Sequence, residues 1–135
     1  DMGREDFTKI PGGLPGVETR GELIYSYGVA KRRISAARMC RCLSENPARL
    51  YGLFPRKGIL RPGSDADIVV YDPTLSHVIR AQDCVANVDY NPYEGFATVG
   101  GIRQVWLRGQ LSVSEGKVLA ETPAGRYMAR GKNSL

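Results

Sequence analysis

The sequence has 135 residues, 42% of them hydrophobic and 24% charged, with a formal net charge of +5. This length and balance predict one globular unit with its own core and exclude an intrinsically disordered chain. No apolar run approaches the roughly 18–20 residues that span a bilayer, and no basic stripe is interleaved with aromatic residues, so we expect neither a membrane nor a nucleic-acid partner.

The chain is predicted to open with a loop and a helix. Residues 6–18 form the loop, because three Gly and two Pro fall between positions 11 and 16. Residues 19–34 are predicted to form a helix, although Gly28 weakens that prediction. The helical face is indicated by apolar residues at i, i+4, i+7 and i+11, namely Leu23, Tyr27, Ala30 and Ile34.

A second helix is predicted over residues 36–45. Ser35 precedes it and is a plausible N-cap. Asn46-Pro47 is expected to interrupt this helix, because the residue before a proline avoids the helical region. Pro47 then starts another helical turn through Leu50, which Gly52 ends.

From about Lys57 the pattern changes to short β-rich runs separated by Gly, Pro and Asp. The expected strands are Ile59-Leu60, Ile68–Tyr71, the weakly indicated Val78-Ile79, Ile102–Leu107, Leu111–Val113 and Lys117–Leu119. Asp72-Pro73 is expected to stop the run that begins at Ile68. Hairpin turns are predicted at Arg108–Gln110 and Ser114–Lys117. The sequence therefore predicts helices followed by a β meander.

The residues that most enzymes need for catalysis are sparse. The chain has one histidine, His77, whereas a zinc hydrolase site needs three or more His, Asp, Glu or Cys ligands. We interpret His77 as a surface or hydrogen-bonded residue, and Asp65 and Asp67 as turn residues that bind nearby backbone N–H groups. The three cysteines form no C-x-x-C pair, which favours reduced thiols in a cytoplasmic protein.

Five segments resemble, in order, motifs of the hydantoinases and dihydropyrimidinases. Asp6–Arg20 resembles their loop "D-F-T-K-I-P-N-G-x-P-G-V-E-x-R". Glu45–Gly58 is similar to "N-P-A-x-L-F-G-L-x-P-R-K-G", and Gly63–Pro73 contains their "G-S-D-A-D-I-V-V-x-D". Val88–Gly95 and Gly125–Tyr127 follow. Each motif is modest alone, but the order of the five makes the chain similar to the C-terminal segment of these cyclic amidohydrolases.

The resemblance implies an α/β parent fold, a (β/α)8 metal-dependent hydrolase barrel with a small composite β-sandwich beside it. Residues 1–55 correspond to the C-terminal part of the barrel, with the substrate loop and the terminal helices. Residues 56–120 correspond to a portion of the β-sandwich, and residues 121–135 to a C-terminal tail. On this interpretation the chain begins just after the last barrel strand.

The resemblance also implies an activity. Relatives open a small cyclic amide, a hydantoin or a dihydropyrimidine, with two divalent metal ions, expected to be zinc, whose ligands lie upstream of this segment. The chain itself is expected to bind no metal and to hold no catalytic residue.

Substrate binding carries over to Gly12 and Gly13, because the backbone of the family's "N-G" pair binds the ring amide. Gly12 stands where relatives often have Asn, a change that retains backbone contacts but puts loop packing and substrate preference in question. Arg126 and Tyr127 are expected to help form a homodimer or homotetramer.

Two alternatives remain. One is a non-catalytic dihydropyrimidinase-related scaffold; the retained Pro15-Gly16 after Leu14 favours the enzyme over it. The other is a free-standing binding domain, which the two amphipathic helices disfavour because they have no barrel to cover. If the chain belongs to the enzyme, the isolated 135 residues are expected to be inactive, because one histidine cannot assemble the metal site.

Overall fold

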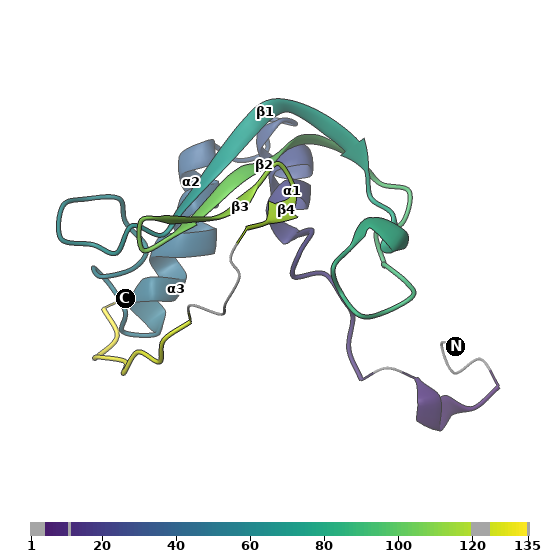
Figure 1. Cartoon of the computed structure of the whole chain (residues 1–135), viewed down its shortest axis with the longest axis horizontal. Coiled ribbons are helices and arrows are strands. Elements are labelled where there is room, and N and C mark those ends of the chain that lie inside the picture. Colours follow the sequence, from purple (N-terminus) through teal and green to yellow (C-terminus); the bar gives the residue numbers. More distant parts are fainter. Residues whose placement is uncertain (1–4, 11, 120–124, 135) are drawn as a thin grey trace.

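Helices precede a four-stranded sheet in the computed structural model of the chain, which describes residues 5–10, 12–119 and 125–134 (Figure 1). The predicted order of helices before strands is confirmed. No helix within the described ranges combines the length and the apolar character needed to cross a membrane. The helical elements are η1 (Phe7–Lys9), α1 (Arg20–Ile24), η2 (Tyr25–Val29), α2 (Ala36–Cys40), η3 (Arg41–Glu45), α3 (Asn46–Leu50) and η4 (Ala81–Asp83).

The first helical stretch joins α1 to the π-helical turn η2 and ends at Val29, earlier than the predicted residue 34. The backbone leaves the right-handed region at Arg32, where φ is 56°. The carbonyl of Gly28 accepts the N–H groups of Arg33 at 2.8 Å and Ile34 at 3.3 Å, which closes the helix end. The apolar pattern that includes Ile34 therefore extends beyond the end of the helix, and this is why the predicted helix was too long.

The second helical stretch runs without a break from Ala36 to Leu50. Ser35 caps it as predicted, since its hydroxyl accepts the N–H of Arg38 at 3.1 Å. The predicted interruption at Asn46-Pro47 is wrong. The turn just before Pro47, η3, is π-helical, and the N–H of Asn46 donates to the carbonyl of Arg41. This wider turn accommodates a proline, which has no N–H to donate.

The sheet is an antiparallel meander in the order β1-β2-β3-β4. Its strands are β1 (Ile68–Val78), β2 (Ala97–Leu107), β3 (Gln110–Ser114) and β4 (Lys117–Val118). Both predicted hairpin turns are confirmed. Arg108 and Gly109 have φ values of 48° and 79°, and Glu115 and Gly116 have 48° and 74°. Two left-handed residues in succession are typical of the tight turns that match the twist of paired strands.

Strand β1 passes through Asp72-Pro73, so the predicted stop there is wrong. The register with β2 shifts between Asp72 and Ser76. Within this bulge the carboxylate of Asp72 accepts the N–H of Thr74 at 2.8 Å and its hydroxyl at 2.6 Å. Residues in a bulge are not paired in the hydrogen-bond ladder of the sheet. A proline, which has no N–H to donate, is therefore tolerated at such a position. Ile59-Leu60, also predicted as a strand, lies outside every strand.

The first helical stretch is held on the sheet by polar and aromatic contacts. The buried hydroxyl of Ser26 donates to the carbonyl of Val99 and accepts its N–H, both at 2.9 Å. The rings of Tyr25 and Tyr71 lie with their centroids 4.5 Å apart. Gly100 adjoins this pair with φ at +79°, and a Cβ added there would lie 2.5 Å from Tyr71 and 2.9 Å from Tyr25. The missing side chain of Gly100 thus permits the close approach of helix and sheet.

Ion pairs within the segment before the sheet and a hydrogen bond from that segment to the β2–β3 hairpin fix the start of the sheet. The ammonium of Lys57 pairs with Asp65 at 2.9 Å and with Asp67. The second carboxylate oxygen of Asp67 accepts the N–H of Arg108, 41 residues further along the chain, at 2.9 Å. Asp67 therefore accepts a backbone N–H, as predicted, but from a residue far along the chain instead of a nearby one.

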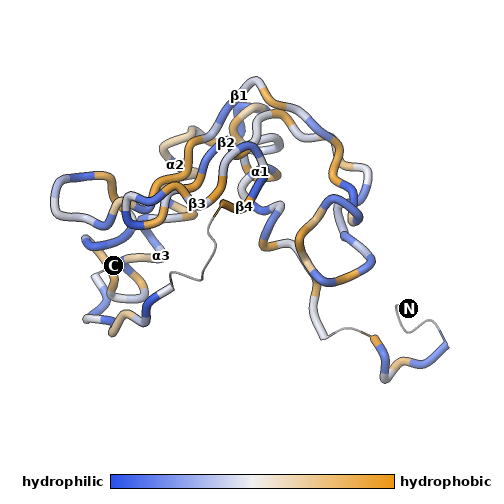
Figure 2. Tube along the Cα trace, viewed as in Figure 1, coloured by the Kyte–Doolittle hydropathy of each residue, from blue (hydrophilic) through white to orange (hydrophobic). Residues whose placement is uncertain are grey.

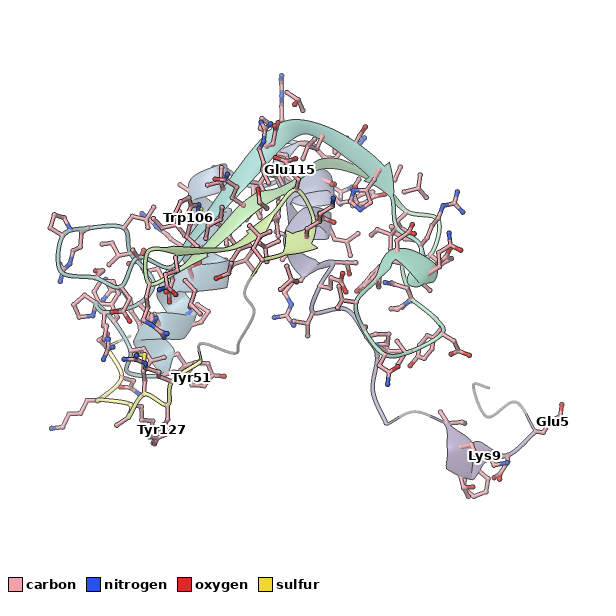
Figure 3. All side chains as sticks on the ribbon, in the orientation of Figure 1. Glu5, Lys9, Tyr51, Trp106, Glu115 and Tyr127 are labelled. Carbon is pink, nitrogen blue, oxygen red and sulfur yellow. The ribbon has the colours of Figure 1, made fainter. Side chains whose placement is uncertain are left out.

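Much apolar surface stays exposed. Among the described residues the buried hydrophobic side chains are Ala48 and Ile79, whereas Val69, Val99 and Val118 are each at least half exposed. Figure 2 shows hydrophobic positions along the strands of the sheet. At the other end, residues 125–134 lie beside the end of α3 (Figure 3). There the N–H of Gly131 donates to the carbonyl of Gly52 at 2.8 Å.

Candidate functional site

The loop that the sequence indicated leaves the body of the molecule as an arm (Figures 1 and 3). Its one helical turn, η1, is capped by Asp6, which accepts the N–H of Thr8 at 3.0 Å and its hydroxyl at 2.7 Å. These bonds from Thr8 hold the pKa of the Asp6 carboxyl below its usual value. Phe7 is 82% exposed. The prediction of a loop is confirmed for the described residues 6–10 and 12–18 apart from this short turn.

Gly12 and Gly13 follow η1 in the arm. Both are exposed, and a Cβ on either would meet no atom within 4 Å. The hydroxyl of Tyr90 donates to the carbonyl of Gly13 at 3.2 Å. The backbone here is therefore accessible to a ligand, while the Gly13 carbonyl is held by the hydrogen bond from Tyr90.

Two further contacts hold the residues that follow. The ring of Tyr93 would lie 3.5 Å from a Cβ on Gly16. The two carboxylate oxygens of Glu18 accept the N–H of Val85 at 3.0 and 3.2 Å. All these partners belong to residues 80–95, which connect β1 to β2 and are called here the β1–β2 loop. These contacts attach the described part of the arm to the β1–β2 loop.

The β1–β2 loop is itself closed at its base and braced inside. The N–H of Ile79 donates to the carbonyl of Phe96 at 2.9 Å, and Ile79 is 2% exposed. Within the loop, the side-chain oxygen of Asn91 accepts the N–H of Tyr93 at 2.9 Å, and its amide nitrogen donates to the sulfur of Cys84 at 3.2 Å. A loop with joined ends and its own internal bonds is preorganised.

His77, on β1, joins the sheet to α1. Its Nδ1 is 3.0 Å from the hydroxyl of Thr98, and its Nε2 is 3.3 Å from the carboxylate of Glu22. Burial raises the pKa of the Glu22 carboxyl, and the nearby His77 and the N–H of Ile102 act in the opposite direction. His77 is a hydrogen-bonded residue, as the sequence indicated, and its ring is 47% exposed.

The described residues do not fit a metal centre. No group of three or more His, Cys, Asp or Glu side chains that could hold a metal ion occurs within residues 5–10, 12–119 and 125–134. Asp65 and Asp67 are engaged by Lys57. Cys40 and Cys42 are exposed free thiols.

Sequence reasoning did not identify Tyr90 and Glu18 as the residues that hold the loop. The available signal was that Val88–Gly95 resembles a motif of the hydantoinases and dihydropyrimidinases. The contact between Tyr90 and Gly13 joins residues 77 positions apart. Such a distant pairing leaves no periodic trace in a single sequence.

Comparison with known proteins gives a consistent result. Residues 16–112 match the sequence model of the amidohydrolase family. D-phenylhydantoinases of two Escherichia coli strains are 42% and 43% identical to this chain over 129 residues, which is 96% of this chain and 28% of each relative. The chain therefore spans less than a third of the length of these relatives.

Solved structures agree with the sequence matches. D-hydantoinase from Bacillus sp. AR9 is 40% identical, with a TM-score of 0.92 over 99% of this chain and 29% of that one. Dihydropyrimidinase from Brevibacillus agri is 41% identical, with the same TM-score and coverage. The L-hydantoinase of Arthrobacter aurescens is 32% identical, with a TM-score of 0.81 over 87% of this chain and 26% of that one. The resemblance to hydantoinases and dihydropyrimidinases is confirmed.

Proposed function

This chain belongs to the amidohydrolase family, and we propose that it is part of a metal-dependent hydrolase that opens hydantoin or dihydropyrimidine rings. The observation that carries the proposal is the identity to D-phenylhydantoinases along nearly the whole chain. The structural likeness to both D-hydantoinases and a dihydropyrimidinase supports the same class of substrate. All of these relatives are named for cyclic amides.

In the proposed hydrolase this segment binds substrate and stabilises the fold. Gly12 and Gly13 present their backbone to the ring amide, which is supported by their exposure and by the open space where a Cβ on either residue would lie. The described residues do not fit a metal centre, so we assign the metal ions, two in number and expected to be zinc, to ligands elsewhere in the protein. The segment supplies no catalytic residue.

We propose the same division of the chain that the sequence resemblance implies. Residues 1–55 end the barrel, residues 56–120 form part of a β-sandwich and residues 121–135 form a tail at a homodimer or homotetramer contact. The exposed apolar side chains of the sheet support a covering layer from the rest of the protein. Tyr127, 93% exposed, supports a contact through the tail. Free thiols suit the cytoplasm.

The full-length protein is expected to hydrolyse dihydrouracil or a 5-substituted hydantoin, and a chelator is expected to abolish that activity. Chromatography of the ring-opened carbamoyl product measures it. The isolated 135-residue chain serves as the control and should show no turnover. A metal-loaded full-length protein that opens neither ring would contradict the proposal and favour the non-catalytic scaffold.

A further inference from the structure

Tyr90 reaches out of the β1–β2 loop to the arm. The loop that carries it is closed at Ile79 and Phe96 and braced by Asn91, so the position of Tyr90 is set before any ligand arrives. Tyr90 is itself half-buried. Its hydroxyl donates to the carbonyl of Gly13 at 3.2 Å. One peptide group of the arm thus takes its orientation from a distant, preorganised loop.

Gly13 needs such an external support. Gly12 and Gly13 have no side chains to pack, and a Cβ added to either would meet no atom within 4 Å. Glycine has more backbone freedom than any other residue, so an unsupported Gly-Gly pair must be ordered whenever it binds a ligand. Fixing the peptide in advance removes that entropic penalty from the binding step.

Glu18 anchors the other end of the same stretch. Its carboxylate receives the N–H of Val85 on both oxygens, at 3.0 and 3.2 Å. Charge-assisted bonds of this kind are stronger than neutral ones. Gly13 to Glu18 is therefore held at both ends by one loop, with the ring of Tyr93 beside Gly16 between them.

We propose that Tyr90 is a positioning residue for substrate binding, which sets the orientation of the Gly13 peptide, and that Glu18 is the second anchor of the same loop. The inference rests on the proposed function, because it assumes that this peptide meets the ring amide. Tyr90 acts through Gly13 and need not touch the substrate. Tyr90 therefore affects the affinity for the substrate, whereas groups elsewhere in the protein carry out the bond-breaking step.

Tyr90→Phe in the full-length protein tests the inference. We expect KM for the ring substrate that the wild-type protein opens to rise about 2- to 12-fold, the range that one neutral hydrogen bond is worth. We expect kcat to change less, because loss of binding that is equal in ground and transition states raises KM alone. The melting temperature should stay at the wild-type value. Tyr51→Phe removes a hydroxyl from an exposed tyrosine on the end of α3 and should change neither parameter.

Two substitutions at Glu18 provide a second, independent test. Glu18→Ala removes the acceptor for the Val85 N–H and should raise KM at least as much as Tyr90→Phe does. Glu18→Gln keeps an oxygen that can accept that N–H and should restore most of the lost affinity. A purely electrostatic role for Glu18 would make the two variants equal.

The outcomes separate this inference from the proposed function. Hydrolysis by the wild-type protein with an unchanged KM in Tyr90→Phe would overturn the positioning role alone. A fall in melting temperature with no change in KM would also overturn it, because Tyr90 would then only stabilise the fold. Failure of the wild-type protein to open either ring would refute the proposed function, and the inference with it.

Discussion

Gly100→Ala is expected to destabilise the protein by about 3 kcal/mol. The backbone of Gly100 has φ at +79°, where a Cβ costs about 1–2 kcal/mol. The added Cβ would also lie 2.5 Å from the ring of Tyr71 and 2.9 Å from that of Tyr25, and overpacking of this kind costs about 1–3 kcal/mol. Because the two rings belong to a sheet strand and a helix, the clash would push these elements apart. Denaturant and thermal unfolding of the full-length protein measure the loss.

Gly109→Ala is the matched control. Gly109 has the same φ of +79°, but a Cβ there would meet no atom within 4 Å. This variant should lose only the conformational part, about 1 kcal/mol. The difference between the two variants isolates the contact with the tyrosines. Equal losses would contradict the close packing of the first helical stretch on the sheet.

Asp67→Ala is expected to cost about 1–2 kcal/mol, because it removes hydrogen bonds that join residues far apart in the chain. The carboxylate of Asp67 pairs with the ammonium of Lys57 and accepts a hydrogen bond from the N–H of Arg108. One side chain therefore connects the segment before the sheet to the β2–β3 hairpin. Asp67→Asn keeps an acceptor for the Arg108 N–H but loses the charge opposite Lys57, and should fall between the wild type and the alanine variant. Unfolding curves of the three proteins at pH 7 provide the comparison.

The contribution of Asp67 should also depend on pH. Burial raises the pKa of its carboxyl, but the hydrogen bonds from Lys57 and Arg108 outweigh burial and hold the pKa below the ordinary 3.8. A carboxyl with a lowered folded pKa stabilises the protein above its unfolded pKa and loses that effect as the pH falls through the folded value. The gap between the wild type and Asp67→Ala should therefore be constant from pH 7 to about 5 and shrink below 3.8. A gap that widens in acid would refute the assignment.

Features set by neighbouring residues could be predicted from the sequence. The Arg108-Gly109 turn and the Ser35 cap each depend on a few adjacent residues, and both are confirmed. The predictions at Pro47 and Pro73 were wrong for a shared reason. In each case the element continues through the proline because its backbone is irregular there. The irregularity is the π-helical turn η3 at Pro47 and the bulge in β1 at Pro73. Proline propensity alone does not reveal such irregularities.

The candidate site could be predicted in part. The resemblance to hydantoinases singled out Gly12 and Gly13, whereas their composition indicated only a loop. The support from Tyr90 and Glu18 could not be predicted, since it depends on how a loop between two strands folds back over the start of the chain. Long-range contacts of this kind come from the tertiary structure.

A structure of the full-length protein with bound ring-opened product tests the central claim most directly. Our account predicts a backbone N–H or carbonyl of Gly12 or Gly13 within about 2.7–3.2 Å of the amide of the former ring. It also predicts that the hydroxyl of Tyr90 still donates to Gly13. A product bound on metal ions with both glycines beyond hydrogen-bond reach would contradict the account, because this segment would then have no part in substrate binding.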